Sequence, residues 1–133
     1  MAGIKYDPQQ EAYELNYVLW DKDVTVRFYV EEQQEIIDAL TDIAQMLDKI
    51  NRNKKKIAEI ILRDGWAGGK KSAEGGAEGL EKSLFIDSCS VELDEDIGIV
   101  ISLLLGSDDG SLKGLLSVEL GEDSGLEFIG WAE

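Results

Sequence analysis

The spacing of apolar residues changes twice along this chain, and this constrains the fold more than any other feature. In residues 13–20 and 24–30 apolar residues alternate with polar ones, the period of two that is typical of strands. In residues 36–50 they recur at steps of three and four, as on one face of an α-helix. Beyond residue 84 the chain returns to short apolar runs separated by turn residues. We therefore expect an α+β fold.

The first two alternating segments predict an N-terminal β-hairpin. Asp21, Lys22 and Asp23 form a short polar connection between them, of the length that joins antiparallel neighbours. We expect Trp20, at the end of the first strand, to pack into the core.

Two helices are expected after the hairpin. The first carries Glu31, Glu32 and Glu35 near its start and Lys49 and Arg52 near its end, an order that complements the helix dipole. The second follows Asn53 and ends near residue 64; its narrow apolar face consists of Ile57, Ile60 and Ile61.

A basic cluster spans the junction between the helices and comprises Lys49, Arg52, Lys54, Lys55 and Lys56. It has no aromatic residues interleaved with its charges, so we interpret it as a solvated helix end or an internal counter-charge rather than a phosphate site. Residues 64–83 hold six glycines and predict a flexible glycine-rich loop within a single domain of residues 1–133.

Four apolar segments, at residues 84–93, 99–105, 112–120 and 126–131, predict a C-terminal β-meander. The connections between them are short and rich in Gly, Asp and Ser, as in tight antiparallel turns. One face of the third segment carries Leu112, Leu116, Val118 and Leu120, so we expect the sheet to be buried on one side. Both helices should pack on that apolar face of the antiparallel meander.

The charge of the chain limits its partners. The formal net charge is −15, and residues 84–133 contain twelve Asp or Glu residues against a single basic residue, Lys113. Phosphate contacts by Lys and Arg dominate affinity for DNA and RNA, so the sequence argues against a nucleic-acid partner. It favours a basic protein partner.

The predicted meander brings acidic turns together. Its first and third turns fall at one end of the sheet, which should place Asp94, Glu95 and Asp96 near Glu122 and Asp123. Glu119 is expected on the nearby open face of the sheet. We predict that these six residues form a partner-binding surface that attracts a basic protein; the alternative is a charged rim that serves only solubility.

Several chemistries are excluded or disfavoured by composition. The chain has no histidine and a single cysteine, so it lacks a base for a Ser or Cys nucleophile and the ligands of an ordinary zinc site. We expect no catalytic residues, no metal and no cofactor. Lone Cys89 lies in a predicted strand and is interpreted as a buried structural thiol. A calcium-binding domain, a carboxylate-based enzyme and an acidic adaptor remain as alternatives.

The chain resembles a bacterial family of uncharacterised domains through its element order, its strand end at Leu19-Trp20-Asp21 and the strand Leu112-Lys-Gly-Leu-Leu-Ser-Val118. Family members carry a glycine followed by histidine in that late strand, where this chain has Gly114 and Leu115, so a role of that histidine does not transfer. Members and relatives of the family look like immunity proteins encoded beside the toxins they neutralise. The resemblance implies a non-catalytic immunity protein that occludes a cognate toxin.

Residues 1–10 contain no apolar stretch like that of a signal peptide, and the longest apolar run, residues 98–106, is too short to span a bilayer. We therefore expect a cytoplasmic protein that does not bind membranes. An exposed edge of the meander leaves both a monomer and a homodimer open.

Overall fold

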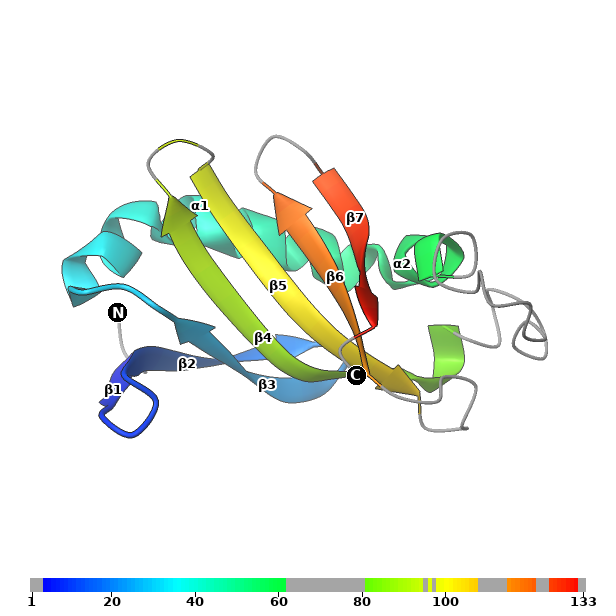
Figure 1. The fold of residues 1–133 in the computed structure, drawn as a ribbon, viewed down its shortest axis with the longest axis horizontal. Helices are drawn as coiled ribbons and strands as arrows, with labels where there is room; N and C mark the ends of the chain where they lie inside the picture. The colour runs from blue at the N-terminus through cyan, green and yellow to red at the C-terminus, as the bar shows by residue number, and fades with distance from the viewer. Residues whose placement is uncertain are drawn as a thin grey trace.

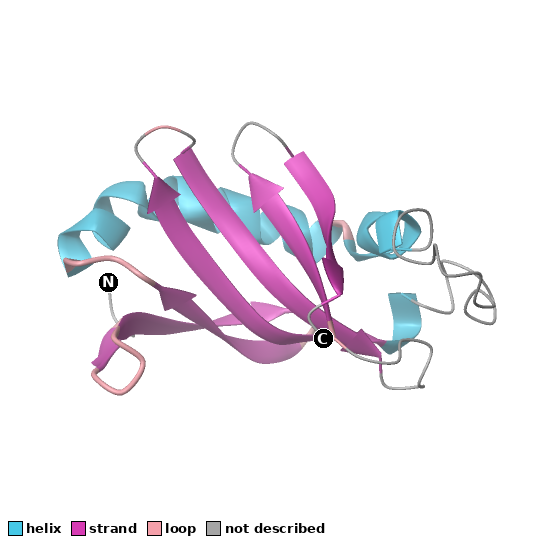
Figure 2. Ribbon diagram, in the orientation of Figure 1, coloured by secondary structure: helices cyan, strands magenta, loops and turns pink. Residues whose placement is uncertain are grey.

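The computed structural model describes residues 4–61, 81–94, 96, 98–107, 115–121 and 125–131, with only the backbone at 128, 130 and 131. Its elements form a sheet and a layer of helices (Figures 1 and 2). The order along the chain is β1 (Lys5–Asp7), β2 (Ala12–Leu19), β3 (Lys22–Phe28), α1 (Gln33–Arg52), α2 (Lys54–Ile60), β4 (Leu84–Asp94), β5 (Gly98–Ser107), β6 (Leu116–Gly121) and β7 (Gly125–Trp131). The predicted α+β class is confirmed.

All seven strands form one sheet whose spatial order follows the chain, from β1 to β7. Every neighbouring pair is antiparallel except β3 and β4, which run parallel because the chain passes through both helices between them. The arrangement agrees only roughly with the expected one. The hairpin and the meander are halves of a single sheet, and the short strand β1, which the sequence did not predict, extends it beside β2.

The helices lie on one face of the sheet and leave the other face open; in Figure 1, α1 passes behind the strands and α2 follows it to the right of β7. The apolar stripe of α1 is buried, with Ile36, Ile43 and Ile50 fully inaccessible to solvent. Strand residues that face the helices, such as Val26, Val91 and Leu103, complete the core. Each buried side chain of this size contributes roughly 1.5–3 kcal/mol of hydrophobic stabilisation.

Helix α1 begins at Gln33, earlier than its apolar stripe indicates. The backbone N–H of Glu32 donates to the carboxylate of Glu35 at 3.0 Å, one half of a capping box that fixes the start of the helix.

The hairpin turn is tighter than predicted. Lys22 and Asp23 belong to β3, and Trp20 and Asp21 alone occupy the turn, with φ angles of 54° and 66°. Two consecutive left-handed residues match the twist of the flanking strands, which is the reason hairpins favour this two-residue turn.

Most of the predicted glycine-rich loop, residues 64–80 with Trp66, lies outside the described residues. Residues 81–83 are helical rather than part of a loop. Cys89 is 1% exposed, so the prediction of a buried thiol in a strand is confirmed.

Candidate functional site

The acidic end of β4 lies at the same end of the sheet as the strand ends Gly121 and Gly125. Asp94 pairs with Gly98 where β4 turns into β5, and Gly121 pairs with Gly125 where β6 turns into β7. Gly121 is also the partner of Val100, two residues from Gly98 on the same strand. The end of β4 and the start of β5 therefore lie beside the end of β6 and the start of β7, at the upper edge in Figure 1.

The structure describes three of the six predicted binding residues. Asp94 and Asp96 are exposed in the β4–β5 turn, where the Asp94 Oδ1 accepts the backbone N–H of Asp96 at 2.7 Å. This local bond fixes the turn conformation. Glu119 is partly buried on the open face of β6. Glu95, Glu122 and Asp123 lie outside the described residues.

Three further carboxylates lie near this end of the sheet. Glu92 is exposed two residues before Asp94, and Glu127 on β7 stands directly opposite Glu119. Asp42 comes from α1 and lines a shallow groove beside Gly121, together with Lys49. We call Asp42, Glu92, Asp94, Asp96, Glu119 and Glu127 the acidic surface. The strand alternation placed Glu127 on the open face, but the position of Asp42 depends on the direction of α1, for which the sequence has no local signal.

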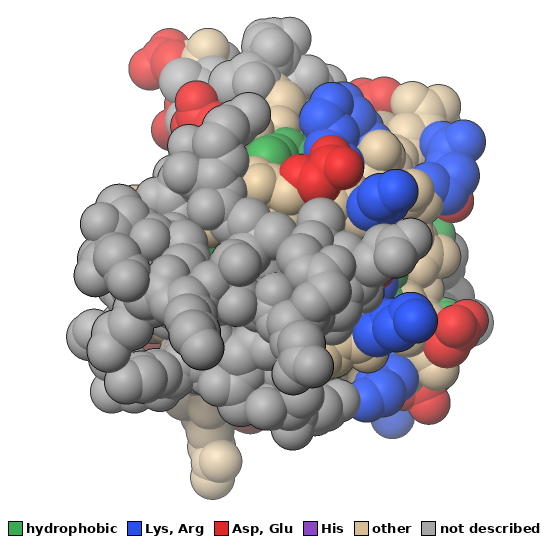
Figure 3. Space-filling model, turned by 90° about the vertical axis from the view of Figure 1, so that its right-hand side faces the viewer, with side chains coloured by type: hydrophobic (Ala, Val, Ile, Leu, Met, Phe, Trp, Pro, Cys, Tyr) green, Lys and Arg blue, Asp and Glu red, His purple; other side chains and the backbone are tan. Residues whose placement is uncertain are grey.

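Apart from Lys49, which lines the groove beside Asp42, a group of basic side chains lies away from the acidic surface. The described residues of β4 to β7 include no Lys or Arg. Lys22, Lys54 and Lys82 instead line a hollow of about 380 Å³ next to Leu84, where β4 begins, opposite its acidic end. Figure 3, viewed from the side of α2, shows Lys and Arg side chains collected on that face.

Trp20 borders this basic hollow and has a structural role. Its indole Nε1–H donates to the carbonyl oxygen of Ile50 at 3.0 Å, and its backbone N–H donates to the side chain of Asn51 at 2.7 Å. The ammonium of Lys54 lies 5.2 Å from the centre of the indole ring, within the range of a cation–π contact. Trp20 is partly buried and packs against the core cluster, as predicted.

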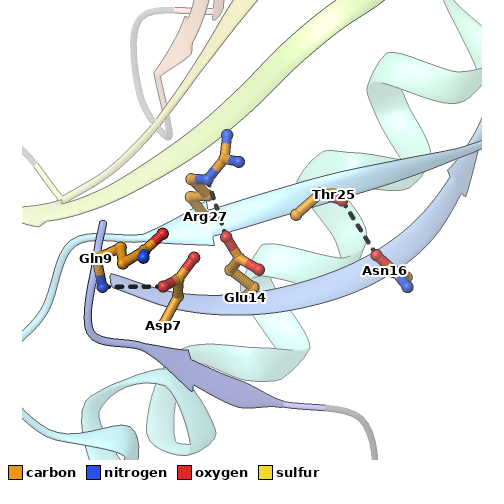
Figure 4. Close-up of polar contacts among 6 residues, drawn as sticks. All are labelled: Asp7, Gln9, Glu14, Asn16, Thr25 and Arg27. Atoms are coloured by element: carbon orange, nitrogen blue, oxygen red, sulfur yellow. Dashed lines mark hydrogen bonds and ion pairs between the residues drawn. The ribbon is translucent and has the colours of Figure 1, made fainter. Parts of the chain in front are cut away.

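A row of polar side chains crosses the open face of the sheet. Register pairs connect neighbouring strands in the sequence Lys5, Glu14, Arg27, Ser90, Ser102, Glu119 and Glu127. Arg27 Nε donates to Glu14 Oε2 at 3.0 Å, and Thr25 donates to Asn16 at 3.2 Å beside it (Figure 4). In the turn between β1 and β2, the side chain of Asp7 accepts the backbone N–H of Gln9 at 2.9 Å (Figure 4).

The single cysteine is buried, and no metal centre is found in the described part of the chain. Burial raises the pKa of the Cys89 thiol from 9.0 to about 12, which keeps it protonated and unreactive. Among the described residues no three His, Cys, Asp or Glu side chains are grouped so that they could hold a metal ion. None of the described helices combines the length and the apolarity needed to cross a membrane.

Comparison with known proteins leaves the chain without an assigned family. No protein-family model matches it, and no curated protein or solved structure matches it either.

Proposed function

We propose that this chain is a non-catalytic acidic binding protein of the immunity type, which neutralises a cognate bacterial toxin by steric and electrostatic occlusion. The observation that carries the proposal is the acidic surface: carboxylates from α1, the β4–β5 turn and the open face share one end of a sheet whose described strands β4 to β7 carry no Lys or Arg. A basic toxin fits this surface.

Electrostatic attraction would act mainly on the rate of encounter. Asp94 and Asp96 are exposed, so each contributes little to the affinity of the formed complex. Grouped on one rim they produce a field that accelerates association with a basic partner by roughly 10- to 1000-fold at low salt. Salt screens this field, so association should slow as ionic strength rises.

Apolar groups beside the acidic surface would supply contacts of shorter range. Val100 is partly exposed on the open face of β5, and Ile129 on the edge strand β7 is 49% exposed. Stable interfaces commonly combine an apolar centre with a charged rim. This combination supports occlusion by a surface rather than insertion into a cleft.

The proposal is tested with the purified protein encoded by the neighbouring gene. Association rates are measured at low and high salt for the parent and for Asp94→Asn with Asp96→Asn, which removes two charges and keeps the side-chain acceptor at position 94. The matched control is Asp23→Asn with Glu59→Gln, two exposed acids outside the acidic surface. We expect the turn variant to slow association by about tenfold at low salt and the control to change it little.

A protection assay separates an immunity protein from an acidic adaptor. Bacteria that express the neighbouring gene product should grow only when the present chain is co-expressed, if that product is a toxin. Binding without any effect on growth would favour the adaptor. Absence of binding, or equal loss in the turn variant and the control, would refute the immunity proposal.

A further inference from the structure

The open face of the sheet contains a hollow that the proposed function does not use. It measures about 270 Å³ and lies over the middle of β3 to β6. Its polar and aromatic lining consists of Arg27, Tyr29, Ser88, Ser90, Ser102 and Ser117. Cys89 and Leu103 also line it, but their side chains are buried in the core, so they present backbone atoms.

Arg27 lines one side of the hollow and has hydrogen-bond donors that are available to a ligand. Its Nε donates to Glu14, and among the described residues its two terminal nitrogens have no hydrogen-bond partner. Figure 4 shows the end of the guanidinium directed away from Glu14 toward β4. On β4 the register neighbour of Arg27 is Ser90, so the terminal nitrogens face the hollow.

The serines provide hydroxyls from three adjacent strands. Ser88 and Ser90 come from β4, Ser102 from β5 and Ser117 from β6. Ser102 donates a long hydrogen bond of 3.4 Å to Glu119, whereas the other three hydroxyls have no partner within the described part of the chain. A hydroxyl both donates and accepts hydrogen bonds, so the floor of the hollow suits a ligand that also does both.

An apolar wall completes the hollow. Tyr29 is 50% exposed directly after β3, and the partly exposed Leu104 lies on β5. An exposed aromatic ring beside converging polar groups is typical of a small-molecule site, in which the ring packs on an apolar ligand face and the polar groups fix its orientation.

We propose that this hollow binds a neutral sugar ring. Ring hydroxyls would pair with the serines and with the terminal nitrogens of Arg27, and the C–H face of the ring would pack on Tyr29. A neutral ligand is favoured over an anion because Glu14 already compensates the charge of Arg27 and the chain carries a net charge of −15. The hollow is shallow and open, so we expect affinity in the millimolar range. This site is distinct from the toxin-binding rim, and either proposal can fail without the other.

The test is a titration of the isotope-labelled full chain, followed by amide chemical shifts. The probes are methyl β-glucoside, methyl β-galactoside and N-acetylglucosamine, with glucuronate and inorganic phosphate as the anionic arm. We expect at least one neutral sugar to cause saturable shifts at the amides of Ser88, Ser90 and Ser102. Shifts from the anions alone, or no saturable shift from any neutral sugar at tens of millimolar, would overturn the proposal.

Variants establish that the shifts report this hollow. Tyr29→Ala should weaken binding about tenfold and Ser90→Ala about two- to fivefold, the usual effects of a lost ring contact and a lost hydrogen bond. The matched control is Tyr6→Ala, since Tyr6 is 52% exposed on β1, away from the hollow. Equal weakening by the control, or unchanged binding in Tyr29→Ala and Ser90→Ala, would also refute the site.

Discussion

The indole nitrogen of Trp20 donates a 3.0 Å hydrogen bond to the carbonyl oxygen of Ile50 and so ties the β2–β3 turn to the last turn of α1. The same carbonyl oxygen accepts the backbone N–H of the C-cap residue Asn53 at 3.2 Å, so Trp20 is its second donor. Asn51 in the same turn accepts the backbone N–H of Trp20 at 2.7 Å. Two hydrogen bonds thus hold a left-handed residue against the helix end.

Replacing Trp20 should destabilise the fold in two distinguishable steps. Trp20→Phe keeps an aromatic ring but removes the donor, which we expect to cost about 1 kcal/mol. Trp20→Ala also removes the packing, and we expect a total cost of about 3 kcal/mol. Urea unfolding measures both values. Tyr6→Phe is the control, because Tyr6 is half exposed and removal of its hydroxyl should leave stability unchanged. Parent-like stability of Trp20→Phe would contradict the role of the indole bond.

Replacing the other turn residue, Asp21, with glycine should stabilise the protein. Asp21 has a φ of 66°, a conformation that costs a residue with a Cβ about 1 kcal/mol or more and costs glycine little. Part of that gain is lost to the larger entropy of unfolded glycine, so we expect Asp21→Gly to stabilise the protein by about 0.5 kcal/mol. Asp23→Gly is the control; Asp23 is paired with Val18 within the ladder, and there glycine should destabilise. A lower melting temperature for Asp21→Gly would refute the expected relief of strain.

Local patterns predicted the long elements of this fold and missed those set by distant contacts. The stripe around Ile43 and the alternation around Val26 are strong signals because many residues share one period. Strand β1 has three residues, too few to show a period. The parallel pairing of Val26 with Cys89 joins segments separated by both helices, and such a pair leaves no mark in either segment.

The candidate sites likewise combine residues that local patterns place correctly with residues whose neighbours depend on distant parts of the fold. The position of Asp94 at the same end of the sheet as Gly121, the last residue of β6, follows from the antiparallel order of the meander strands alone. The approach of Asp42 to Gly121 requires the crossing direction of α1, and the approach of Arg27 to Ser90 requires the β3–β4 register. Both depend on the packed sheet as a whole. The serine hollow was therefore not predictable, although its serines were visible in the strands.

Removing the repulsion between two neighbouring carboxylates should stabilise the edge of the sheet. Glu119 and Glu127 are directly opposite on β6 and β7, an arrangement that is unfavourable across antiparallel strands. Glu127→Lys converts the pair to opposite charges, and we expect a gain of about 0.5–1 kcal/mol that shrinks at high salt.

The control for that gain is Glu92→Lys, which changes the net charge equally but faces the uncharged Val100. Melting temperatures of both variants are compared at low and high salt. A salt-dependent gain in Glu127→Lys that exceeds the gain in Glu92→Lys is expected. Equal gains would show that relief of the overall negative charge, rather than the pair, accounts for the effect.

Burial of Cys89 should make stability fall at alkaline pH. Desolvation raises the pKa of this thiol from 9.0 to about 12 in the folded chain, so between these values only the unfolded chain releases the proton. Proton release stabilises the unfolded state, and the free energy of unfolding should therefore decline above pH 9 with a slope approaching about 1.4 kcal/mol per pH unit. Below that range the thiol is protonated in both states and contributes no slope.

Cys89→Ala isolates this contribution, because the tyrosines and lysines that also titrate at alkaline pH are common to both proteins. Urea unfolding at about pH 8 and about pH 10 should show a larger loss of stability in the parent than in Cys89→Ala. The thiol of Cys89 is protonated and 1% exposed in the folded parent. A thiol reagent should therefore modify it only as fast as the protein locally unfolds and exposes the side chain. Rapid modification of the folded chain, or identical pH slopes in the two proteins, would mean that Cys89 is accessible to solvent and that β4 packs less tightly against the helices than described.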